Sequence, residues 1–223
     1  MAHKRAVIMA GGKGTRLHPY TLDTPKPMLP INGQPMLEHI IERFEYMGFE
    51  EIWVAVNHQK NVIKGYFNDR VQYIEEPTEM GTAGALSLLK ERDGVTVVIN
   101  GDVLCNVNLN AVIDDHLSTK SIATICAYTH KVQIPYGEIL ANNESGLLGF
   151  TEKPTKTYLV NAGIYVLSEA CFEYLNGSSD TMPETIQRAW MHDYRVNVFT
   201  MRNVFWLDVG TPEQYKRANE LIK

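Results

Sequence analysis

Short, almost wholly apolar segments alternate with amphipathic ones through the first half of this chain. Runs such as AVIM and VTVVI are typical of strands that are buried on both faces of a parallel sheet. Strands are predicted at residues 5–9, 52–56, 71–75 and 95–100. The intervening segments carry apolar residues at helical spacing, and helices are predicted at residues 34–48, 58–67, 82–90 and 109–117. This alternation predicts an α/β fold with a doubly wound, mostly parallel, Rossmann-like sheet.

The alternation of apolar strands with amphipathic helices ends after Tyr128. The segment YGEILANNESGLLGFTEKP predicts two short strands around a turn at Asn142, Asn143 and Gly146. Further strands are predicted at residues 161–167, 195–201 and 205–210, and further helices at residues 168–175, 182–190 and 211–222. No repeat or linker divides the chain. The sequence therefore predicts a single domain over residues 1–223 that contains a β-rich insertion.

Charge and composition exclude several classes of function. The net charge of −5 argues against general nucleic-acid binding, which usually requires a basic surface. No segment approaches the roughly 20 apolar residues that span a bilayer, and the N-terminus MAHKRAVIMAGG lacks the apolar run of a signal peptide. The three cysteines, Cys105, Cys126 and Cys171, are widely spaced, which favours reduced core residues over a metal site. We expect a cytoplasmic protein with neither nucleic acid nor membrane as a partner.

The stretch AGGKGTR follows the first predicted strand, where a doubly wound sheet binds its ligands. Gly11, Gly12 and Gly14 let a bulky anion approach the backbone, whose N–H groups can form an anion-binding nest. Arg16 can clamp phosphate oxygens, and Lys26, flanked by prolines, offers a second positive charge. The spacing matches neither the dinucleotide fingerprint, whose third glycine is missing, nor the P-loop. The alternative is a plain glycine-rich turn with surface charges.

The stretch GGKGTRLHPYTLDTPKPMLPI resembles the signature of the sugar-phosphate nucleotidyltransferases, also called nucleotide-sugar pyrophosphorylases. Six later elements of the same family pattern follow in order: EMGTAGAL, NGDV, YGE, TEKP, NAGIY and WLDVG. The resemblance runs from about Ala6 to Asn219. It implies a GT-A-like nucleotidyltransferase fold and transfer of a nucleoside monophosphate from a triphosphate to a sugar 1-phosphate. The resemblance also suggests a homodimer.

The resemblance assigns roles to the phosphate-binding and charged residues. Those that would wrap the triphosphate are Ala10, Gly11, Gly12, Gly14 and Thr15. Arg16 would stabilise the departing pyrophosphate, and Lys26 would contact the phosphates at the reaction centre. Asp102 and Asp208 would hold Mg²⁺ together with phosphate oxygens and water. Either aspartate alone could also be a turn or helix-cap residue.

The base and sugar positions are also implied by the resemblance. The base would lie on Gly81, Thr82 and Ala83, where Glu76 or Glu79 could accept hydrogen bonds from guanine, although both glutamates could equally be solvated loop charges. The residues that would line the sugar pocket are Tyr136, Gly137, Glu152, Lys153 and Asn161. Glu138 departs from the small apolar residue expected after Tyr-Gly.

The resemblance leads to one expected function and several alternatives. The C-terminal half is most similar to guanylyltransferases of bacterial surface sugars, of the legionaminic acid or heptose type, so we expect GTP and a role in surface glycan synthesis. The alternatives are uridylyl, thymidylyl or cytidylyl transfer within the same family, or an idle homologue that senses nucleotide or sugar phosphate. The presence of Arg16, Lys26, Asp102 and Asp208 argues against an idle protein.

Overall fold

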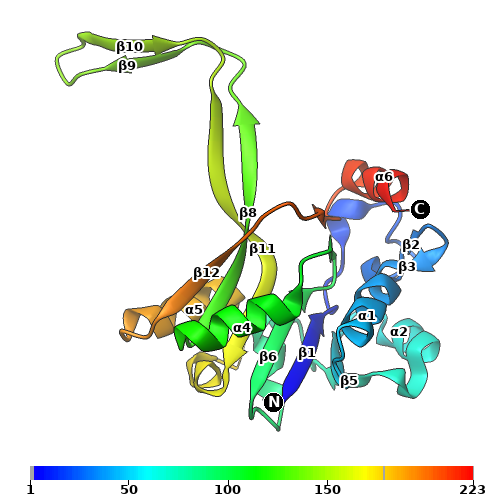
Figure 1. The fold of residues 1–223 in the computed structure, drawn as a ribbon. Coiled ribbons are helices and arrows are strands. Elements are labelled where there is room, and N and C mark those ends of the chain that lie inside the picture. Colours follow the sequence, from blue (N-terminus) through cyan, green and yellow to red (C-terminus); the bar gives the residue numbers. More distant parts are fainter. Residues whose placement is uncertain (1–2, 178, 223) are drawn as a thin grey trace.

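The computed structural model describes residues 3–177 and 179–222, and a seven-stranded sheet forms its centre (Figure 1). The strand order is β12-β8-β11-β6-β1-β4-β5. Strand β11 runs antiparallel to both of its neighbours, whereas the other neighbouring strands pair in parallel. The bounds are β1 Lys4–Met9, β4 Glu51–Val56, β5 Gln72–Glu75, β6 Val95–Asn100, β8 Ala123–Gln133, β11 Thr155–Ser168 and β12 Val196–Met201. The doubly wound, mostly parallel sheet predicted from the sequence is confirmed.

Helices cover both faces of this sheet. Successive side chains of β1 point to opposite faces of the sheet. Ala6 and Ile8 belong to the buried cluster on one face, and Val7 belongs to the cluster on the other. The first face carries α1 (Met36–Tyr46), α2 (Lys60–Phe67), α4 (Leu109–Thr119) and α6 (Pro212–Leu221). The second carries α3 (Gly81–Gly84), α5 (Met182–Met191) and the 3₁₀ helices η4 (Ala85–Leu88) and η5 (Glu169–Tyr174).

Local sequence explains where the main helices begin and end. The apolar residues of α1 recur at helical spacing, and Gly48 follows the helix with a φ of 78°. Helix α5 begins with a capping box between Thr181 and Glu184. Helix α6 is capped by Thr211, whose side chain accepts a hydrogen bond from the backbone N–H of Gln214.

Two strands of the sheet extend beyond it as an arm. Strand β8 pairs with β12 as far as Tyr128, and β11 pairs with β6 only from Ile164 onward. The remaining lengths of β8 and β11 pair only with each other, and a hairpin of β9 (Glu138–Ala141) and β10 (Leu147–Thr151) follows at the tip. Figure 1 shows this ribbon standing clear of the domain, with the hairpin bent away from α6. We call residues 129–160 the arm.

The remaining elements are short. Two small antiparallel pairs are formed by β2 (Pro30–Ile31) with β3 (Gln34–Pro35), and by β7 (Val103–Cys105) with β13 (Trp206–Asp208). The other 3₁₀ turns are η1 (Thr15–Leu17), η2 (Lys26–Met28) and η3 (Asn68–Arg70). Within the described ranges the longest α-helices have eleven residues, and none is long and apolar enough to cross a membrane.

The structure corrects the sequence-based prediction at several elements, and the short strands β2, β3 and β7 were not predicted. Strand β8 was not predicted, and β11 is twice as long as the strand predicted at residues 161–167, with 14 residues. The helix predicted at residues 82–90 is one α-helical turn followed by η4. The helix predicted at residues 168–175 is the 3₁₀ helix η5. Each of these two segments is short, and helical periodicity alone does not separate the two kinds of helix.

Candidate active site

A polar cavity of about 480 Å³ lies at the carboxyl ends of β1, β5 and β6. Its lining residues are 9–16 after β1, Lys26 and Pro27, then Glu76, Glu79, Gly81 and Thr82 after β5, then residues 100–102 at the end of β6, and Gly210. This is the edge at which parallel α/β sheets bind their ligands. Segments far apart in the sequence therefore form one site.

The glycine-rich loop is shaped by contacts on both of its sides. Gly14 has a φ of 65°, and a Cβ there would lie 2.9 Å from the Cβ of Lys26. Its carbonyl oxygen accepts hydrogen bonds from the Thr21 hydroxyl at 2.8 Å and from the Leu17 N–H at 2.9 Å. A Cβ on Gly11 would overlap the carboxylate of Glu76. The two glycines thus let the loop pack against both Lys26 and the residues after β5.

Lys26 and Asp102 form an ion pair in which the ammonium group donates to the carboxylate. Lys26 lies on the 3₁₀ turn η2 after Pro25, and Asp102 follows β6. The carbonyl oxygen of Asp102 accepts a hydrogen bond of 2.8 Å from the Val209 N–H. This bond and the pairing of β7 with β13 hold Asp102 next to Asp208.

Asp208 is a desolvated carboxylate behind the cavity wall. Burial raises its pKa, and the nearby negative charge of Asp102 raises it further, whereas Lys26 and Arg16 oppose the shift. Among the described residues, Asp208 Oδ1 is buried without a hydrogen-bond partner. It would lie 3.5 Å from a Cβ on Gly210, which lines the cavity, and the Arg16 guanidinium lies at the same distance from that position. The four charged residues predicted to be catalytic therefore meet at one place.

Glu76 lies at the other end of the cavity and is buried. Its Oε2 accepts a hydrogen bond of 3.1 Å from the Met80 N–H, which holds the carboxylate beneath the loop 77–81. Burial raises its pKa, and the charge of Glu79 adds to this shift. Glu79 is exposed and pairs with Lys13 at 3.1 Å across the cavity mouth. Of the two glutamates, Glu76 is thus buried at the cavity wall, and Glu79 is exposed at the cavity mouth.

The structure brings together most of the predicted nucleotide-binding residues. Those lining the cavity are Ala10, Gly11, Gly12, Gly14, Thr15, Arg16, Glu76, Gly81, Thr82 and Asp102, together with Lys26. Ala83 does not line it, because its side chain is fully buried and its N–H donates to the Asp180 carbonyl at 3.0 Å. Lys13, Asn100 and Gly210 also line the cavity. No role was predicted for these three residues, although each belongs to a sequence motif quoted above.

The predicted sugar-binding residues lie elsewhere. Tyr136, Gly137, Glu152 and Lys153 lie on the arm between the ribbon and the tip hairpin, and none is among the residues that line the cavity. Asn161 lies at the base of the arm, where its amide donates to the Tyr165 hydroxyl at 2.7 Å. The structure therefore separates the predicted sugar residues of the arm from the predicted nucleotide residues.

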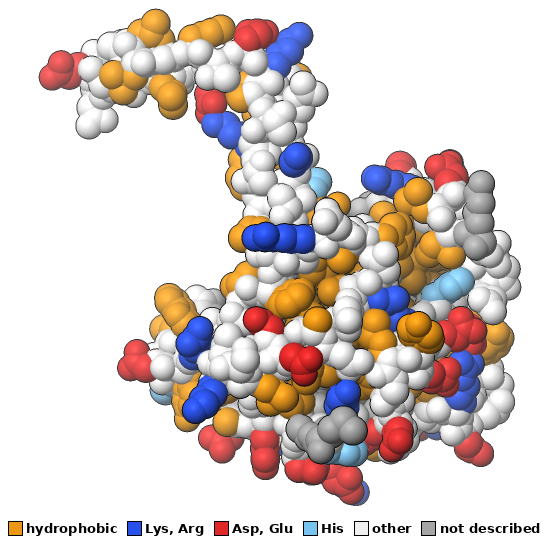
Figure 2. Space-filling view, in the orientation of Figure 1, with side chains coloured by type: hydrophobic (Ala, Val, Ile, Leu, Met, Phe, Trp, Pro, Cys, Tyr) orange, Lys and Arg blue, Asp and Glu red, His pale blue; other side chains and the backbone are white. Residues whose placement is uncertain are grey.

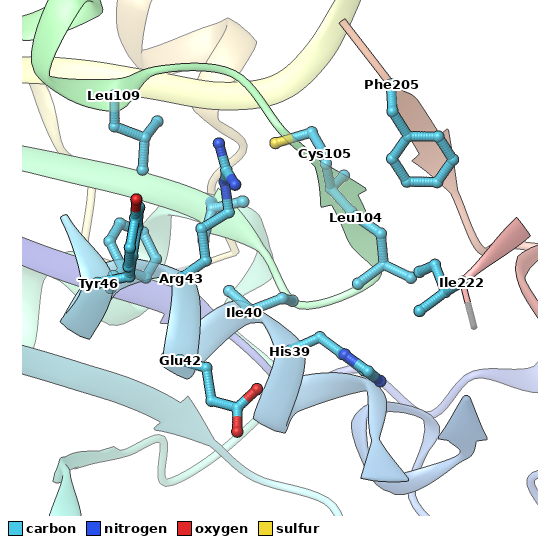
Figure 3. A pocket seen from close by; sticks show the side chains of 13 residues that line it. His39, Ile40, Glu42, Arg43, Tyr46, Leu104, Cys105, Leu109, Phe205 and Ile222 are labelled. Atoms are coloured by element: carbon cyan, nitrogen blue, oxygen red, sulfur yellow. The ribbon is translucent and has the colours of Figure 1, made fainter. Parts of the chain in front are cut away.

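A second cavity, of about 340 Å³, lies between α1 and β7 (Figure 3). It is largely apolar, and Leu104 and Cys105 form part of its wall. Arg43 points into it from α1 and donates to the Val107 carbonyl oxygen at 2.6 Å. None of the residues predicted to be functional lines this cavity.

The fold and the polar cavity define an α/β protein with a glycine-rich loop and two carboxylates at the carboxyl edge of its sheet. Comparison with known families gives the particular class. The family model described as nucleotidyl transferase matches residues 5–223, and the chain belongs to this family. The resemblance found in the sequence is confirmed.

Known relatives agree with this assignment. The chain is 32% identical over 234 residues to the bifunctional protein GlmU of Methanococcus aeolicus, covering 97% of this chain and 54% of the relative. It is 30% identical over 226 residues to mannose-1-phosphate guanylyltransferase of Mycobacterium tuberculosis, covering 96% and 63%. The chain thus spans between about half and two thirds of the length of these relatives.

Solved structures share the fold over the whole chain. HddC from Yersinia pseudotuberculosis superposes with a TM-score of 0.76 at 26% identity, and both chains are covered completely. The same protein complexed with GMP-PN gives a TM-score of 0.73 at 25% identity. These matches confirm the nucleotidyltransferase architecture.

Proposed function

We propose that this chain transfers a nucleoside monophosphate, with GTP as the preferred donor, to a sugar 1-phosphate or related acceptor sugar. The products are a nucleotide-activated sugar for surface glycan synthesis and pyrophosphate. The observation that carries the proposal is the meeting of Arg16, Lys26, Asp102 and Asp208 at the carboxyl edge of the sheet, beside a glycine-rich loop. Such a site neutralises phosphate charge, which is the main demand of phosphoryl transfer.

In the proposed reaction an oxygen of the acceptor attacks the α-phosphorus of the triphosphate. The bond from the α-phosphorus to its bridging oxygen breaks, and pyrophosphate leaves with the electron pair. The loop at residues 11–15 binds the phosphates, and Arg16 stabilises the charge of the departing pyrophosphate. Lys26 exchanges Asp102 for a phosphate oxygen when the nucleotide enters. No covalent intermediate with the protein is needed, so catalysis consists of positioning and charge neutralisation.

Asp102 and Asp208 would hold Mg²⁺, which neutralises phosphate charge when it is bound. Their chemistry fits this ion, because Mg²⁺ in such enzymes uses one or two carboxylates and completes its shell with phosphate oxygens and water. The buried Asp208 Oδ1 lacks a partner among the described residues and is therefore available as a ligand. No group of three or more His, Cys, Asp or Glu side chains suited to a metal occurs in residues 3–177 and 179–222. A site that shares its ion with the substrate needs no third carboxylate.

The preference for GTP rests on Glu76. Its buried carboxylate faces the glycine loop and can accept hydrogen bonds from guanine N1–H and N2–H₂, which thymine and uracil cannot offer together. The guanylyltransferase among the relatives and the GMP-PN complex of HddC support the same choice. Transfer from UTP, dTTP or CTP is the alternative.

The test is pyrophosphate release with Mg²⁺ in a matrix of nucleotides against acceptors. The nucleotides are ATP, GTP, CTP, UTP and dTTP, and the acceptors are sugar 1-phosphates and nine-carbon sugar acids. Release with GTP and one acceptor supports the proposal, and release with another nucleotide reassigns the base. Nucleotide binding without release for any acceptor would favour a sensor, and absence of binding would contradict the role of the glycine loop.

A further inference from the structure

The arm has two open edges and no layer covering it. Beyond Tyr128 and Val160 the ribbon has lost both neighbouring strands, so only the β8–β11 pairing remains. The tip hairpin likewise consists of β9 and β10 alone. Two-stranded ribbons of this kind are marginally stable in water unless a face is packed against something. The arm therefore needs a partner surface.

Large apolar side chains are exposed on both faces of the arm. They are Val132, Tyr136, Ile139, Leu140, Leu147, Leu148, Phe150, Tyr158 and Leu159. Consecutive residues of a strand point to opposite faces, so the neighbours Ile139 and Leu140 place apolar groups on both sides of the hairpin. Figure 2 shows orange hydrophobic side chains along this projection.

The exposed apolar area matches that of a stable protein interface. At roughly 100 Å² each, these side chains present on the order of 900 Å², close to the ~800 Å² that each partner contributes to a standard interface. Apolar surface of this extent on one projection marks an interaction site. Because both faces are apolar, the partner must enclose the hairpin rather than touch one side of it.

The bend between the ribbon and the hairpin is held by local contacts. Lys156 pairs with Glu138 at 2.5 Å, and the Ile134 N–H donates to the Pro154 carbonyl at 2.9 Å. The Phe150 ring lies against Gly137, where a Cβ would be 2.6 Å from the tip of the ring. These contacts direct the hairpin away from α6, as Figure 1 shows.

The cavity is correspondingly incomplete. Its described lining comes from the first 102 residues and Gly210, with nothing from the arm. The arm in turn carries four residues predicted to bind the sugar: Tyr136, Gly137, Glu152 and Lys153. A transfer reaction needs donor and acceptor held together. Two copies related by a two-fold axis can supply both a partner surface for the arm and an acceptor side for the cavity, because each arm can then reach the other copy.

We propose that two copies of this chain exchange arms, so that the arm of each copy completes the acceptor side of the other's polar cavity. The proposal rests on the proposed function for the role of the arm residues. The pairing itself rests on the exposed apolar faces and the fixed bend. Each active site is then formed by two chains, with the nucleotide side from one and the sugar side from the other.

The oligomeric state is the first test and does not depend on activity. Sedimentation equilibrium of the unaltered full chain is expected to give a dimer, and a monomer at micromolar concentration would overturn the proposal. Leu148→Asp on the hairpin should shift the dimer toward monomer. Leu117→Asp, which replaces an exposed leucine on α4 outside the arm, should leave it unchanged. Far-UV circular dichroism and thermal unfolding verify that both variants are folded.

Complementation between two inactive variants is the decisive test. Lys26→Ala removes a group of the nucleotide side, and Lys153→Ala removes a group of the arm. The two are co-expressed with different affinity tags, and the mixed dimer is purified through both tags. One of its two composite sites then carries neither substitution, so about half of the wild-type rate of pyrophosphate release is expected. The other site carries both substitutions.

The alternative outcomes separate a failure of arm exchange from a failure of the proposed function. A mixed dimer no faster than its parents shows that the arm serves its own chain, which overturns arm exchange and leaves the proposed function intact. Wild-type activity in Lys153→Ala alone also overturns it. Failure to recover any doubly tagged dimer has the same meaning. If the wild-type chain releases no pyrophosphate with any substrate pair, the proposed function fails, and sedimentation alone decides the pairing of arms.

Discussion

Lys26 and Asp102 form an ion pair that joins the turn after the glycine-rich loop to the end of the central strand β6. Both groups are largely shielded from water, with the lysine side chain 12% exposed and the aspartate 22%. The pair keeps the positive charge of Lys26 at the cavity before any phosphate arrives. It also keeps Asp102 from repelling Asp208 at full strength.

Lys26→Ala is expected to lower turnover by on the order of 10²-fold, because it removes charge stabilisation at the transferring phosphate. Asp102→Asn should lower it by a similar factor. Turnover is measured as pyrophosphate release at saturating nucleotide, and far-UV circular dichroism checks the fold. Lys216→Ala, an exposed lysine on α6, is the matched control and should keep wild-type turnover. Near-normal rates in both site variants would contradict the assignment.

Glu76→Gln is expected to weaken GTP binding by about tenfold, because an amide offers guanine fewer acceptor positions than a carboxylate. Affinities for UTP and CTP should change little. Calorimetric titration with each nucleotide measures the difference. Glu79→Gln is the control, because that side chain is exposed and paired with Lys13. An equal loss of affinity for all nucleotides would mean that Glu76 only supports the loop.

Gly81→Ala is expected to lower the free energy of unfolding by about 2 kcal/mol or more and to weaken nucleotide binding. Gly81 has a φ of 77°, and a Cβ there would overlap the carbonyl oxygen of Asp180. Gly65→Ala in α2 is the matched control. It has open space around it and should be neutral or stabilising, since alanine favours a helix. Urea unfolding measures both variants, and equal stability of the two would refute the steric argument.

His116 is expected to make the protein less stable in mild acid. Its ring donates to the Ser168 hydroxyl and accepts from Thr124, each at 2.9 Å, and Ser168 in turn donates to the Ser121 carbonyl. Burial lowers its pKa to about 4. The ring is neutral in the folded state but titrates near 6.5 when unfolded. The contribution of His116 to the free energy of unfolding is therefore complete above about pH 6.5. This free energy falls by up to ~3 kcal/mol as the pH approaches 4.

The measurement is urea unfolding across this pH range for the wild type and His116→Gln. The variant should be less stable at pH 7 and should lose less stability on acidification. His58→Gln, which replaces an exposed histidine, should follow the wild-type curve. Parallel curves for the wild type and His116→Gln would show that another group causes the acid sensitivity.

The first half of the fold could be predicted from the sequence because its strands are buried on both faces. Val95–Asn100 is apolar over almost its whole length, and this pattern allows few other structures. The second half of the fold could be predicted less completely. Strand β8 begins buried and ends exposed, so its sequence ATICAYTHKVQ shows neither a continuous apolar run nor a clean alternation. The arm also carries apolar residues outside any core, which periodicity cannot distinguish from core strands.

Part of the candidate site could likewise be predicted from the sequence, and part of it could not. Residues near Gly11 and Lys26 are close in sequence and follow one strand, so their convergence could be predicted from the order of elements. The proximity of Asp102 and Asp208 depends on the pairing of β7 with β13, which are separated by about a hundred residues. Spacing alone could not have supplied it. The position of Tyr136 and Glu152 depends on the bend of the arm, and only the structure fixes that direction.

Three separate loops meet at the carboxyl edge of the sheet, and each extends from its own strand, β1, β5 or β6. The ladder of parallel strands beneath them is continuous and does not depend on any one loop. Under the proposed function, a substitution in the loop after β5 can therefore alter contacts to the base while the glycine-rich loop and Asp102 keep their places. Evolution could thus exchange one nucleobase for another within this scaffold through a few neighbouring substitutions, without rebuilding the chemistry beside them.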